Sequence, residues 1–296
     1  MFSLDRLRAL DAVATHGSLA RAARALHITP SGVSQQLAKL EREAGHALLE
    51  PHGRGVRLTH AGRVLAGHAA RVVTQLSAAE ADLADLGDEI LGPLRLGGVG
   101  SSLRTLLPDV LAALTEAHPR LVPTVVDGEA VDMVPRLLAG ELDLVLVESW
   151  DSRPMPLPEG LAVRTLVAED VDVALSERHP LADRDSIALP ELDGAVWTTC
   201  PPGTEPYEAL VQALRAQGLE PDVRYPVTEY ATMLAFVARD LTLALVPRMA
   251  QPSCPPGVRF VPVRPGLRRE IRAAWRAQGA SPSVRACLEL LGAECG

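Results

Sequence analysis

A short polar segment near the N-terminus carries side chains that can hydrogen-bond to nucleic acid. Gln35 offers a paired donor and acceptor to the edge of a base in the major groove. Serine hydroxyls and the amides of a helix N-terminus can donate to phosphate. The residues with this chemistry are Ser31, Gly32, Ser34, Gln35, Gln36 and Lys39. They predict a DNA-contacting surface, and the alternative is an ordinary solvated helix face.

Two short helices and a tight turn at His27 and Ile28 would position these side chains. Ser18 and Thr29 are residues that N-cap helices, and Pro30 occupies the first position of the second helix. Apolar residues recur at helical spacing in both segments, which gives each helix one face to bury. These residues are Leu19, Ala22, Ala23 and Leu26 in the first helix, and Val33, Leu37 and Leu40 in the second.

A basic hairpin is expected to follow the second helix. Gly45 ends that helix, Leu48 and Leu49 begin an apolar strand, and residues 52–58 are rich in glycine and arginine. An arginine at the tip of such a wing, here Arg54, can enter a minor groove. A solvated turn is the alternative.

The charge of the chain is divided unevenly. Residues 1–71 hold ten Lys or Arg and five Asp or Glu, so this segment carries +5. The remaining residues carry −13, which the net charge of −8 conceals. A basic N-terminal segment on an acidic body fits a protein that meets phosphate with one end only.

A long helix is predicted next, from Thr59 to about Leu86, with no proline inside it. Apolar residues recur along it at alternating steps of four and three, which is typical of a coiled-coil seam. The seam consists of Leu65, Ala69, Val72, Leu76, Ala79, Leu83 and Leu86. We expect it to pair with a second copy of the chain, with the alanines allowing close approach of the backbones. Packing against the chain's own first helix is the alternative.

The rest of the chain alternates short apolar strands with helices, beginning after a break from Gly87 to Pro93. This order indicates an α/β fold with a largely parallel, doubly wound sheet, and about 200 residues suit two lobes. Strands are predicted at 94–97, 122–126, 142–147, 171–175, 195–199, 223–227 and 243–246, and helices at 101–118, 131–138, 207–217 and 232–239.

Ligands of such sheets bind at the carboxyl ends of the strands. The candidates for a cleft between the lobes are Ser101, Ser102, Glu129, Ser149, Thr198, Thr199, Cys200 and Thr228. Ser101 and Ser102 could bind a carboxylate or simply cap their helix. Glu129, Glu148 and Glu229 argue against a simple anion, so the charge of the ligand stays open. Trp150 and Trp197 suit core packing better than an aromatic shelf.

Sequence motifs for catalysis are missing: there is no Gly-x-Ser-x-Gly, no phosphate loop and no His-Glu-x-x-His. Six of the eight histidines lie at or before His68, outside the α/β body. The four cysteines are too widely spaced for a zinc site, so no catalytic residue, metal or cofactor is expected. Cys200 could sense oxidation, but a small buried side chain is the simpler interpretation.

The first residues do not have the pattern of a signal peptide, because Asp5, Arg6 and Arg8 interrupt them, and no run approaches transmembrane length. We therefore expect a cytoplasmic protein rather than an exported solute-binding protein.

The order of motifs resembles the LysR-type transcriptional regulators, and the resemblance covers nearly the whole chain. It is carried by Ala25 to Leu37, Leu40-Glu41, Gly55 to Thr59 and Ala61-Gly62, and in the body by Gly92 to Gly97, Gly140 to Leu144, His179-Pro180-Leu181 and Ala244 to Pro247. Position by position, it implies that Pro30, Ser31, Ser34 and Gln35 lie at bases or phosphates and Arg54 in the wing. Thr29 and Lys39 are further candidate DNA contacts.

Three departures from the family pattern stand out. Many relatives have Gln at position 30, and a Phe-acid-Arg where this chain has Leu49-Glu50-Pro51. Relatives also have Gly-Leu-Gly at Asp240-Leu241-Thr242, so this turn must form without glycine.

The resemblance implies a winged helix-turn-helix at 1–58, with its recognition motif at about 18–37, and a linker helix at 59–88. A two-lobed effector domain like the type 2 periplasmic binding proteins would follow, with lobe I at 92–163 and 264–296 and lobe II at 164–263. The expected partners are a double-stranded DNA operator, a small-molecule effector and further copies in a dimer or tetramer. RNA polymerase is a further candidate, and no membrane partner is expected.

Overall fold

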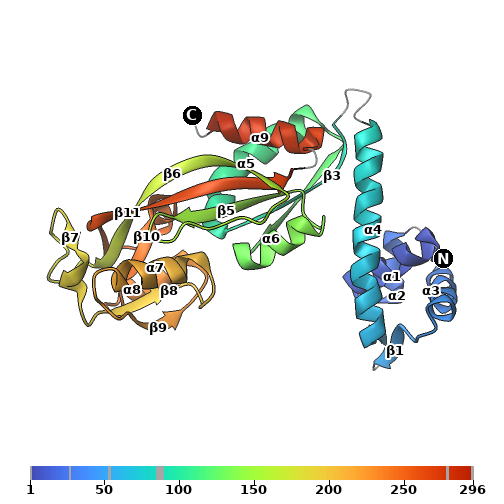
Figure 1. Cartoon of the computed structure of the whole chain (residues 1–296), viewed down its shortest axis with the longest axis horizontal. Coiled ribbons are helices and arrows are strands. Elements are labelled where there is room, and N and C mark those ends of the chain that lie inside the picture. Colours follow the sequence, from blue (N-terminus) through green and yellow to red (C-terminus); the bar gives the residue numbers. More distant parts are fainter. Residues whose placement is uncertain (1, 27, 53–54, 85–89, 278–279, 295–296) are drawn as a thin grey trace. The chain divides into compact units, whose positions relative to one another are not determined.

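The computed structural model describes residues 2–26, 28–52, 55–84, 90–277 and 280–294. The chain divides into two compact units, a smaller one of residues 1–88 with 139–141 and a larger one of residues 89–138 and 142–296 (Figure 1). Each unit has apolar cores of its own. We therefore describe the two units separately.

The N-terminal unit consists of three short helices, a hairpin and a long helix. The elements are α1 (Leu4–His16), α2 (Leu19–Ala25), α3 (Pro30–Ala44), β1 (Leu49–His52), β2 (Gly55–Leu58) and α4 (His60–Ala84). Leu10, Leu37 and Leu40 are completely or almost completely buried where α1 and α3 meet. The predicted helix-turn-helix with its antiparallel wing is confirmed.

The predicted capping residues act as caps. The hydroxyl oxygen of Ser18 accepts a hydrogen bond from the Arg21 amide at 3.2 Å. That of Thr29 accepts one from the Gly32 amide at 3.1 Å, and each bond satisfies an amide that the first turn leaves without a partner. Gly45 ends α3 with a φ of 67°, a left-handed conformation that glycine adopts without steric cost.

Two motif residues attach the wing to the helices. The carboxylate of Glu41 accepts hydrogen bonds from the amides of Leu48 and Leu49 at 2.8 and 3.1 Å. Gly62 lies so close to this strand that a Cβ atom would collide with the carbonyl oxygen of Leu48. Glu41 and Gly62 therefore hold the domain together rather than contact DNA.

The predicted coiled-coil seam on α4 is divided between two roles. Ala69 is fully buried and Leu65 partly buried against the core that α1, α2 and α3 form. The prediction that Ala69 faces a partner is therefore wrong, because the first turns of α4 pack on α1 of the same chain. Val72 is 45% exposed. The part of the seam that begins at Val72 is therefore not covered by the chain's own core and could contact a partner. Leu83 belongs to the last turn of α4, and Leu86 lies outside the described residues.

The C-terminal unit is an α/β body. Its first elements are β3 (Gly92–Gly98), α5 (Gly100–Ala117), β4 (Leu121–Asp127), α6 (Ala130–Leu138), β5 (Leu144–Trp150), β6 (Leu161–Ser176), β7 (Ile187–Ala188) and the 3-10 helix η2 (Leu189–Leu192). Then follow β8 (Val196–Thr199), α7 (Glu205–Arg215), β9 (Asp222–Pro226), α8 (Tyr230–Val237), β10 (Ala244–Pro247), the 3-10 helix η3 (Arg248–Ser253), β11 (Val258–Arg276) and α9 (Pro282–Glu294).

The main sheet has the strand order β10-β6-β11-β5-β3-β4. β3 is parallel to both β4 and β5, as predicted, and β8 and β9 form a separate parallel pair. β11 is antiparallel to both β5 and β6, and β10 is antiparallel to β6. The expectation of a largely parallel sheet therefore holds for β3, β4 and β5 and for the β8–β9 pair, and it is wrong for the pairings of β11 with β5 and β6 and of β10 with β6.

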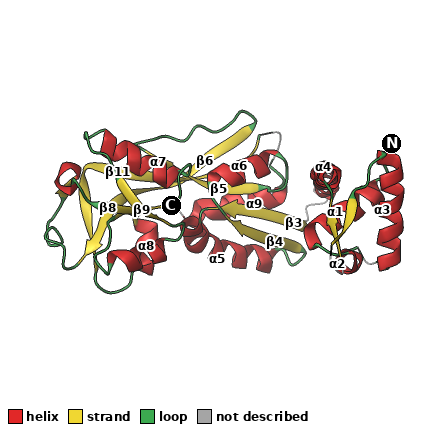
Figure 2. Ribbon diagram, turned by 90° about the horizontal axis from the view of Figure 1, so that it is seen from below, coloured by secondary structure: helices red, strands yellow, loops and turns green. Residues whose placement is uncertain are grey.

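β5 shows why this part of the chain folds in layers. Leu144 and Leu146 belong to a core with α5 and α9, whereas Val145 and Val147 belong to a core with α6. Successive side chains of a strand point to opposite faces of the sheet, so a nearly continuous apolar strand requires helices on both faces. Figure 2 shows α5 and α6 on opposite sides of these strands.

Two long strands, β6 and β11, connect the lobes. Val167 packs with the first lobe and Val171 with the second; on β11, Leu267 packs with the second lobe and Ile271 with the first. The chain therefore crosses between the lobes twice, at about 167–171 and 267–271, a few residues later than the predicted boundaries. The pairing register of the two strands shifts between Pro262 and Leu267.

The turn before β10 contains a backbone conformation that normally favours glycine. Asp240 has a φ of 62°, and it is the one non-glycine residue with positive φ in the described part of the chain. This is the position at which the sequence departs from the family's Gly-Leu-Gly. Aspartate tolerates the left-handed region better than most residues, so the turn is kept without glycine.

Candidate functional site

The exposed face of α3 contains the polar side chains that the sequence singled out. On the opposite face of α3, Val33, Leu37 and Leu40 are buried in the core of the N-terminal unit. The predicted DNA contacts with described positions all lie on its exposed side: Thr29, Pro30, Ser31, Ser34, Gln35 and Lys39. The hydroxyls of Thr29 and Ser31 are 3.0 Å apart, so Thr29 contributes to the local structure as well as to the surface.

The wing carries an ion pair near its base. Arg57 Nε lies 2.6 Å from Glu50 Oε1, and both side chains are exposed. Glu50 occupies the position at which relatives also have an acid, so the departure from the family pattern here is Pro51, which stands where relatives have an arginine. Arg54, the predicted tip residue, lies outside the described residues.

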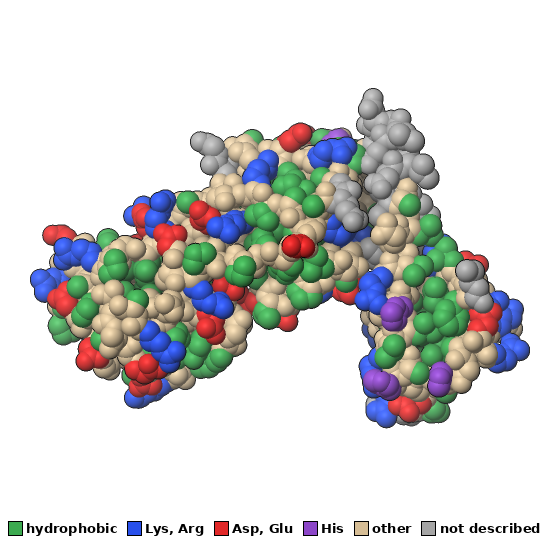
Figure 3. Space-filling model, viewed as in Figure 1, with side chains coloured by type: hydrophobic (Ala, Val, Ile, Leu, Met, Phe, Trp, Pro, Cys, Tyr) green, Lys and Arg blue, Asp and Glu red, His purple; other side chains and the backbone are tan. Residues whose placement is uncertain are grey.

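An apolar groove follows the exposed part of the α4 seam. It is lined by Leu4, Val72, Gln75, Leu76 and Ala79. A second apolar groove includes Phe2, Val64 and Leu65 together with His46 and His68, and Figure 3 shows apolar and histidine side chains together on this unit. The two grooves have no lining residue in common.

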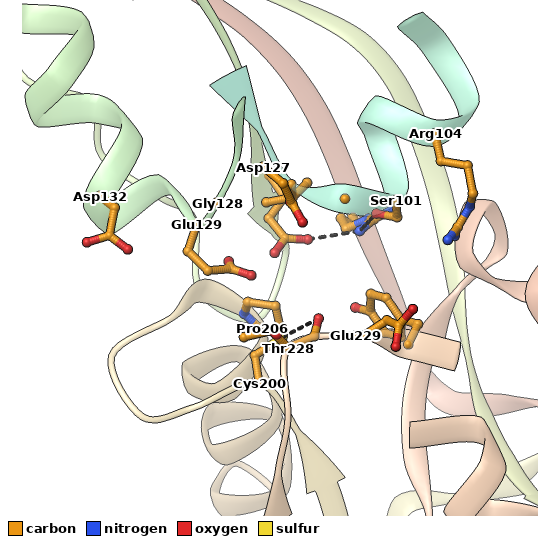
Figure 4. A pocket seen from close by; sticks show the side chains of 15 residues that line it. Ser101, Arg104, Asp127, Gly128, Glu129, Asp132, Cys200, Pro206, Thr228 and Glu229 are labelled. Atoms are coloured by element: carbon orange, nitrogen blue, oxygen red, sulfur yellow. Dashed lines mark hydrogen bonds and ion pairs between the residues drawn. The ribbon is translucent and has the colours of Figure 1, made fainter. Parts of the chain in front are cut away.

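A cavity of about 450 Å³ lies between the lobes of the C-terminal unit (Figure 4). The first lobe lines it from the start of α5, the end of β4, the start of α6, β5 and β11. The second lobe lines it from the segments after β8 and β9 and from α7 and α8. The polar lining residues are Ser101, Arg104, Asp127, Glu129, Asp132, Glu148 and Arg269 on one side and Cys200, Thr228, Glu229 and Tyr230 on the other.

Four of the eight predicted effector contacts line this cavity: Ser101, Glu129, Cys200 and Thr228. Figure 4 shows Ser101 and Glu129 on one side and Cys200 and Thr228 on the other.

The other four predicted contacts are buried and do not line the cavity, so the prediction is wrong for them: Ser102, Ser149, Thr198 and Thr199. Three of these hydroxyls serve the backbone instead. Ser102 donates to the Val99 carbonyl at 2.8 Å, Ser149 accepts from the Met155 amide at 3.1 Å, and Thr198 donates to the Tyr225 carbonyl at 2.6 Å. Position at a strand end therefore did not by itself reveal which way a side chain points.

Arg269 forms a buried ion network at the base of the cavity. Its side chain is fully buried, and its Nη1 lies 2.9 Å from Glu148 Oε2 and 3.0 Å from Ser101 Oγ. Its Nε donates to Glu169 Oε1 at 2.9 Å. The other oxygen of Glu169 accepts the Met249 amide at 2.6 Å. The network therefore joins β5, α5, β6, β11 and η3 where the chain crosses between lobes.

Burial dominates the protonation of the groups around the cavity. It raises the pKa of Glu129 to about 7, helped by the nearby charges of Glu148 and Asp127. It also raises the pKa of Glu148, although Arg269 opposes that rise. Burial alone would lower the pKa of Arg269, but the surrounding carboxylates raise it above its usual value. Arg269 is therefore charged at every physiological pH.

Cys200 is not the reactive kind of cysteine. Its side chain is 1% exposed, and burial, followed by the charge of Glu129, raises the pKa of its thiol. A thiolate is the reactive form, so these surroundings do not support peroxide sensing by Cys200. The indoles of Trp150 and Trp197 are packed in the second lobe's core, which agrees with the packing interpretation.

Sequence reasoning missed Arg269, Arg104 and Tyr230. On β11, Leu267, Arg269, Ile271 and Ala273 are all buried, so an arginine occupies an inward position of an alternating strand. This alternation could have identified Arg269 as a buried residue. It was missed because β11 was not predicted as a strand.

Within the described ranges, no group of three or more His, Cys, Asp and Glu side chains could hold a metal ion. Among those same residues, no helix combines the length and the apolar character that a membrane span needs.

Comparison with family models decides the class of protein. Residues 4–63 match the helix-turn-helix of bacterial regulatory proteins of the lysR family, and residues 87–296 match the LysR substrate binding domain. The chain belongs to the LysR family. This LysR-type regulator thus combines a DNA-binding unit with an effector-binding domain, as the sequence predicted.

Relatives of this LysR-type regulator span nearly its whole length. It is 28% identical to the HTH-type transcriptional regulator TtuA of Agrobacterium vitis, over 97% of this chain and 96% of that protein. It is 32% identical to the small neutral protease regulatory protein of Streptomyces coelicolor, over 92% of this chain and 82% of that protein. These relatives are named as regulators.

Solved structures share the fold. CbnR in complex with its target DNA has a TM-score of 0.71 at 22% identity and covers 99% of both chains. A point variant of full-length OxyR from Pseudomonas aeruginosa has a TM-score of 0.72 at 22% identity, covering 100% of this chain and 98% of that one. The LysR-type regulator therefore shares the fold of these structures.

Proposed function

We propose that this LysR-type regulator binds its operator through α3 and the wing, and that a small molecule in the cavity between the lobes changes that binding. The observation that carries the proposal is the cavity itself, which residues of both lobes line. A ligand that contacts both lobes binds the closed arrangement better than the open one, and this difference in affinity is what allows it to shift an equilibrium.

The operator contacts are proposed for Thr29, Pro30, Ser31, Ser34, Gln35 and Lys39, with Arg54 in the wing. The exposed positions of the first six support this assignment. Gln35 would contact a base edge, and Lys39 would contact phosphate. For the effector, the proposed contacts are Ser101, Glu129, Cys200 and Thr228, to which we add Arg104 and Tyr230.

The regulator would act as a dimer or tetramer, with Val72, Leu76 and Ala79 of α4 at the contact. The apolar groove along these residues supports the assignment, because pairing with a second copy would bury it. Two recognition helices would then meet half-sites about one DNA turn, or a multiple, apart. We propose that the protein acts in the cytoplasm, where it would meet the chromosome and RNA polymerase.

The test uses the full chain and the intergenic DNA beside its own gene. Fluorescence anisotropy would measure binding to that DNA and to a random fragment of equal length, with and without each compound of a metabolite library that raises the melting temperature. At least one stabilising compound should change specific binding. Equal affinity for the two fragments, or stabilising compounds that never change binding, would refute the proposal.

A further inference from the structure

The cavity carries more negative charge than positive charge. Its described lining holds five carboxylates, namely Asp127, Glu129, Asp132, Glu148 and Glu229, and two guanidinium groups, Arg104 and Arg269. Arg269 already contacts Glu148, Glu169 and Ser101, and its side chain is fully buried. Its charge is balanced within the protein, so Arg269 does not serve a ligand anion.

Two polar atoms of the lining are buried without a partner among the described residues. They are the hydroxyl oxygen of Tyr230, whose residue is 9% exposed, and Oε2 of Glu129. Glu129 belongs to the first lobe and Tyr230 to the second, and both line the same cavity. Buried polar atoms without hydrogen bonds are costly and rare, so this pair indicates where a ligand supplies the missing hydrogen bonds.

An ammonium or guanidinium group meets these requirements. It donates several hydrogen bonds, and its positive charge would neutralise the negative charge of Glu129, Asp127 and Asp132. A carboxylate ligand would meet the same side chains as a like charge, which is unfavourable at close range.

We propose that the cavity binds a small organic cation, an amine or a guanidine, with its charged group between Glu129 and Tyr230. The inference rests on the proposed function, because it names the class of effector for the same cavity. The cation would neutralise the surplus charge of the first lobe while it hydrogen-bonds to the second lobe, and it would thereby favour the closed arrangement.

The proposal predicts a dependence on pH. Glu129 interacts with Asp127 at the end of β4, Glu148 on β5, Arg269 on β11 and Cys200 after β8, and burial raises its pKa to about 7. A bound cation favours the ionised carboxylate and lowers that pKa, so binding releases a proton. Affinity should therefore rise about tenfold from pH 6 to pH 8, because the ionised fraction of Glu129 rises by that factor.

The experiment is isothermal titration calorimetry on the full chain at constant ionic strength. The probes are butylamine, 1,4-diaminobutane and butylguanidine, compared with butyrate and butan-1-ol as a matched anion and neutral compound. We expect at least one of the cations to bind about tenfold more weakly at pH 6 than at pH 8, and no binding of butyrate. Butyrate binding as well as the cations, or no cation binding at all, would overturn the proposal.

Three variants separate the ligand role from a structural one. Glu129→Gln should weaken cation binding at least tenfold and remove its pH dependence. Tyr230→Phe should weaken binding several-fold and keep the pH dependence. Glu116→Gln removes an exposed carboxylate of α5 outside the cavity and should leave binding unchanged. A Glu129→Gln protein that binds the cation like the native chain would refute the assignment.

The same samples distinguish this inference from the proposed function. If the cation binds as predicted but anisotropy on the operator does not change, the ligand class stands and the regulatory proposal fails. If an anion instead changes operator binding, regulation through the cavity stands and the cation proposal fails.

Discussion

Arg269 shows how a single residue can be decisive and still be hard to recognise in a sequence. Polar residues at strand ends were the natural candidates, and four of them do line the cavity. Arg269 lies within a strand, at a position that alternation assigns to the interior. Its role depends on Glu148 and Glu169, which are 121 and 100 residues away along the chain. No local pattern contains that information.

Arg269→Met should lower the free energy of unfolding by about 3–5 kcal/mol, because Glu148 and Glu169 would remain buried without their cation. The loss should shrink as the pH falls, since removing Arg269 would raise the pKa of Glu148 further and protonation would then relieve the unpaired charge. Urea unfolding at several pH values measures both effects.

The control is Arg268→Met, which changes the neighbouring side chain, 56% exposed. It should alter stability by less than about 0.5 kcal/mol. A similar loss in both variants would argue against the buried network as the cause.

Gln35→Ala should weaken operator binding by roughly 1–3 kcal/mol and leave binding to random DNA nearly unchanged. A base contact adds affinity only when the matching base lies opposite the side chain. Lys39→Ala provides the contrast, since loss of a phosphate contact should weaken both fragments equally. Anisotropy titrations on the two fragments give the comparison, and an equal loss for Gln35→Ala would exclude base recognition by this residue.

Helices and their caps were more predictable than the long strands. Ser18, Thr29 and Gly45 act locally, so their residue types were enough to place the ends of α2 and α3. The long strand β11 was missed because its pattern mixes arginines and prolines with apolar residues. Its structure depends on pairing with β5 and β6, which are distant in sequence.

Asp240→Val should lower the free energy of unfolding by about 1–3 kcal/mol, because a β-branched residue is strained at a φ of 62°. Asp240→Gly relieves that strain and should stay within about 1 kcal/mol of the native chain. Thermal unfolding of the three proteins tests the order. A valine variant as stable as the glycine variant would contradict the left-handed turn.

Leu76→Asp should dissociate the proposed oligomer, because it places a charge in the apolar groove of α4. Analytical ultracentrifugation measures the mass directly. Val64→Asp is the matched control, since Val64 is also exposed on α4 but lines the other groove. Survival of the oligomer in Leu76→Asp would remove this seam from the interface.

The division of charge between the two units was visible in the sequence, and it predicts which unit controls the response to salt. Arg54→Ala should reduce the slope of log affinity against log salt by about one, because one fewer counterion is released. Arg285→Ala removes a charge from the acidic unit and should leave the slope unchanged. Anisotropy titrations at a series of salt concentrations measure this slope for both variants and for the native chain.

The two-lobed plan was also predictable, because alternating elements and apolar strands restrict the fold class. The antiparallel pairing of β11 with β5 and β6 was not predictable, since a strand's orientation depends on the connection that leads into it. The cavity's charge balance required the structure as well. Counting Glu129, Glu148 and Glu229 suggested acidity, but only the structure shows that the charge of Arg269 is already balanced by Glu148 and Glu169.

The pairing of β6 with β11 at the crossing has a mechanical consequence. Arg269 pairs with Glu169 of β6 and with Trp150 of β5, within a paired stretch of β11 from Leu267 to Ile271 that a register shift bounds at each end. A relative motion of the lobes would therefore have to bend or twist this short paired stretch, and the two register shifts mark the places where the ladder is already irregular.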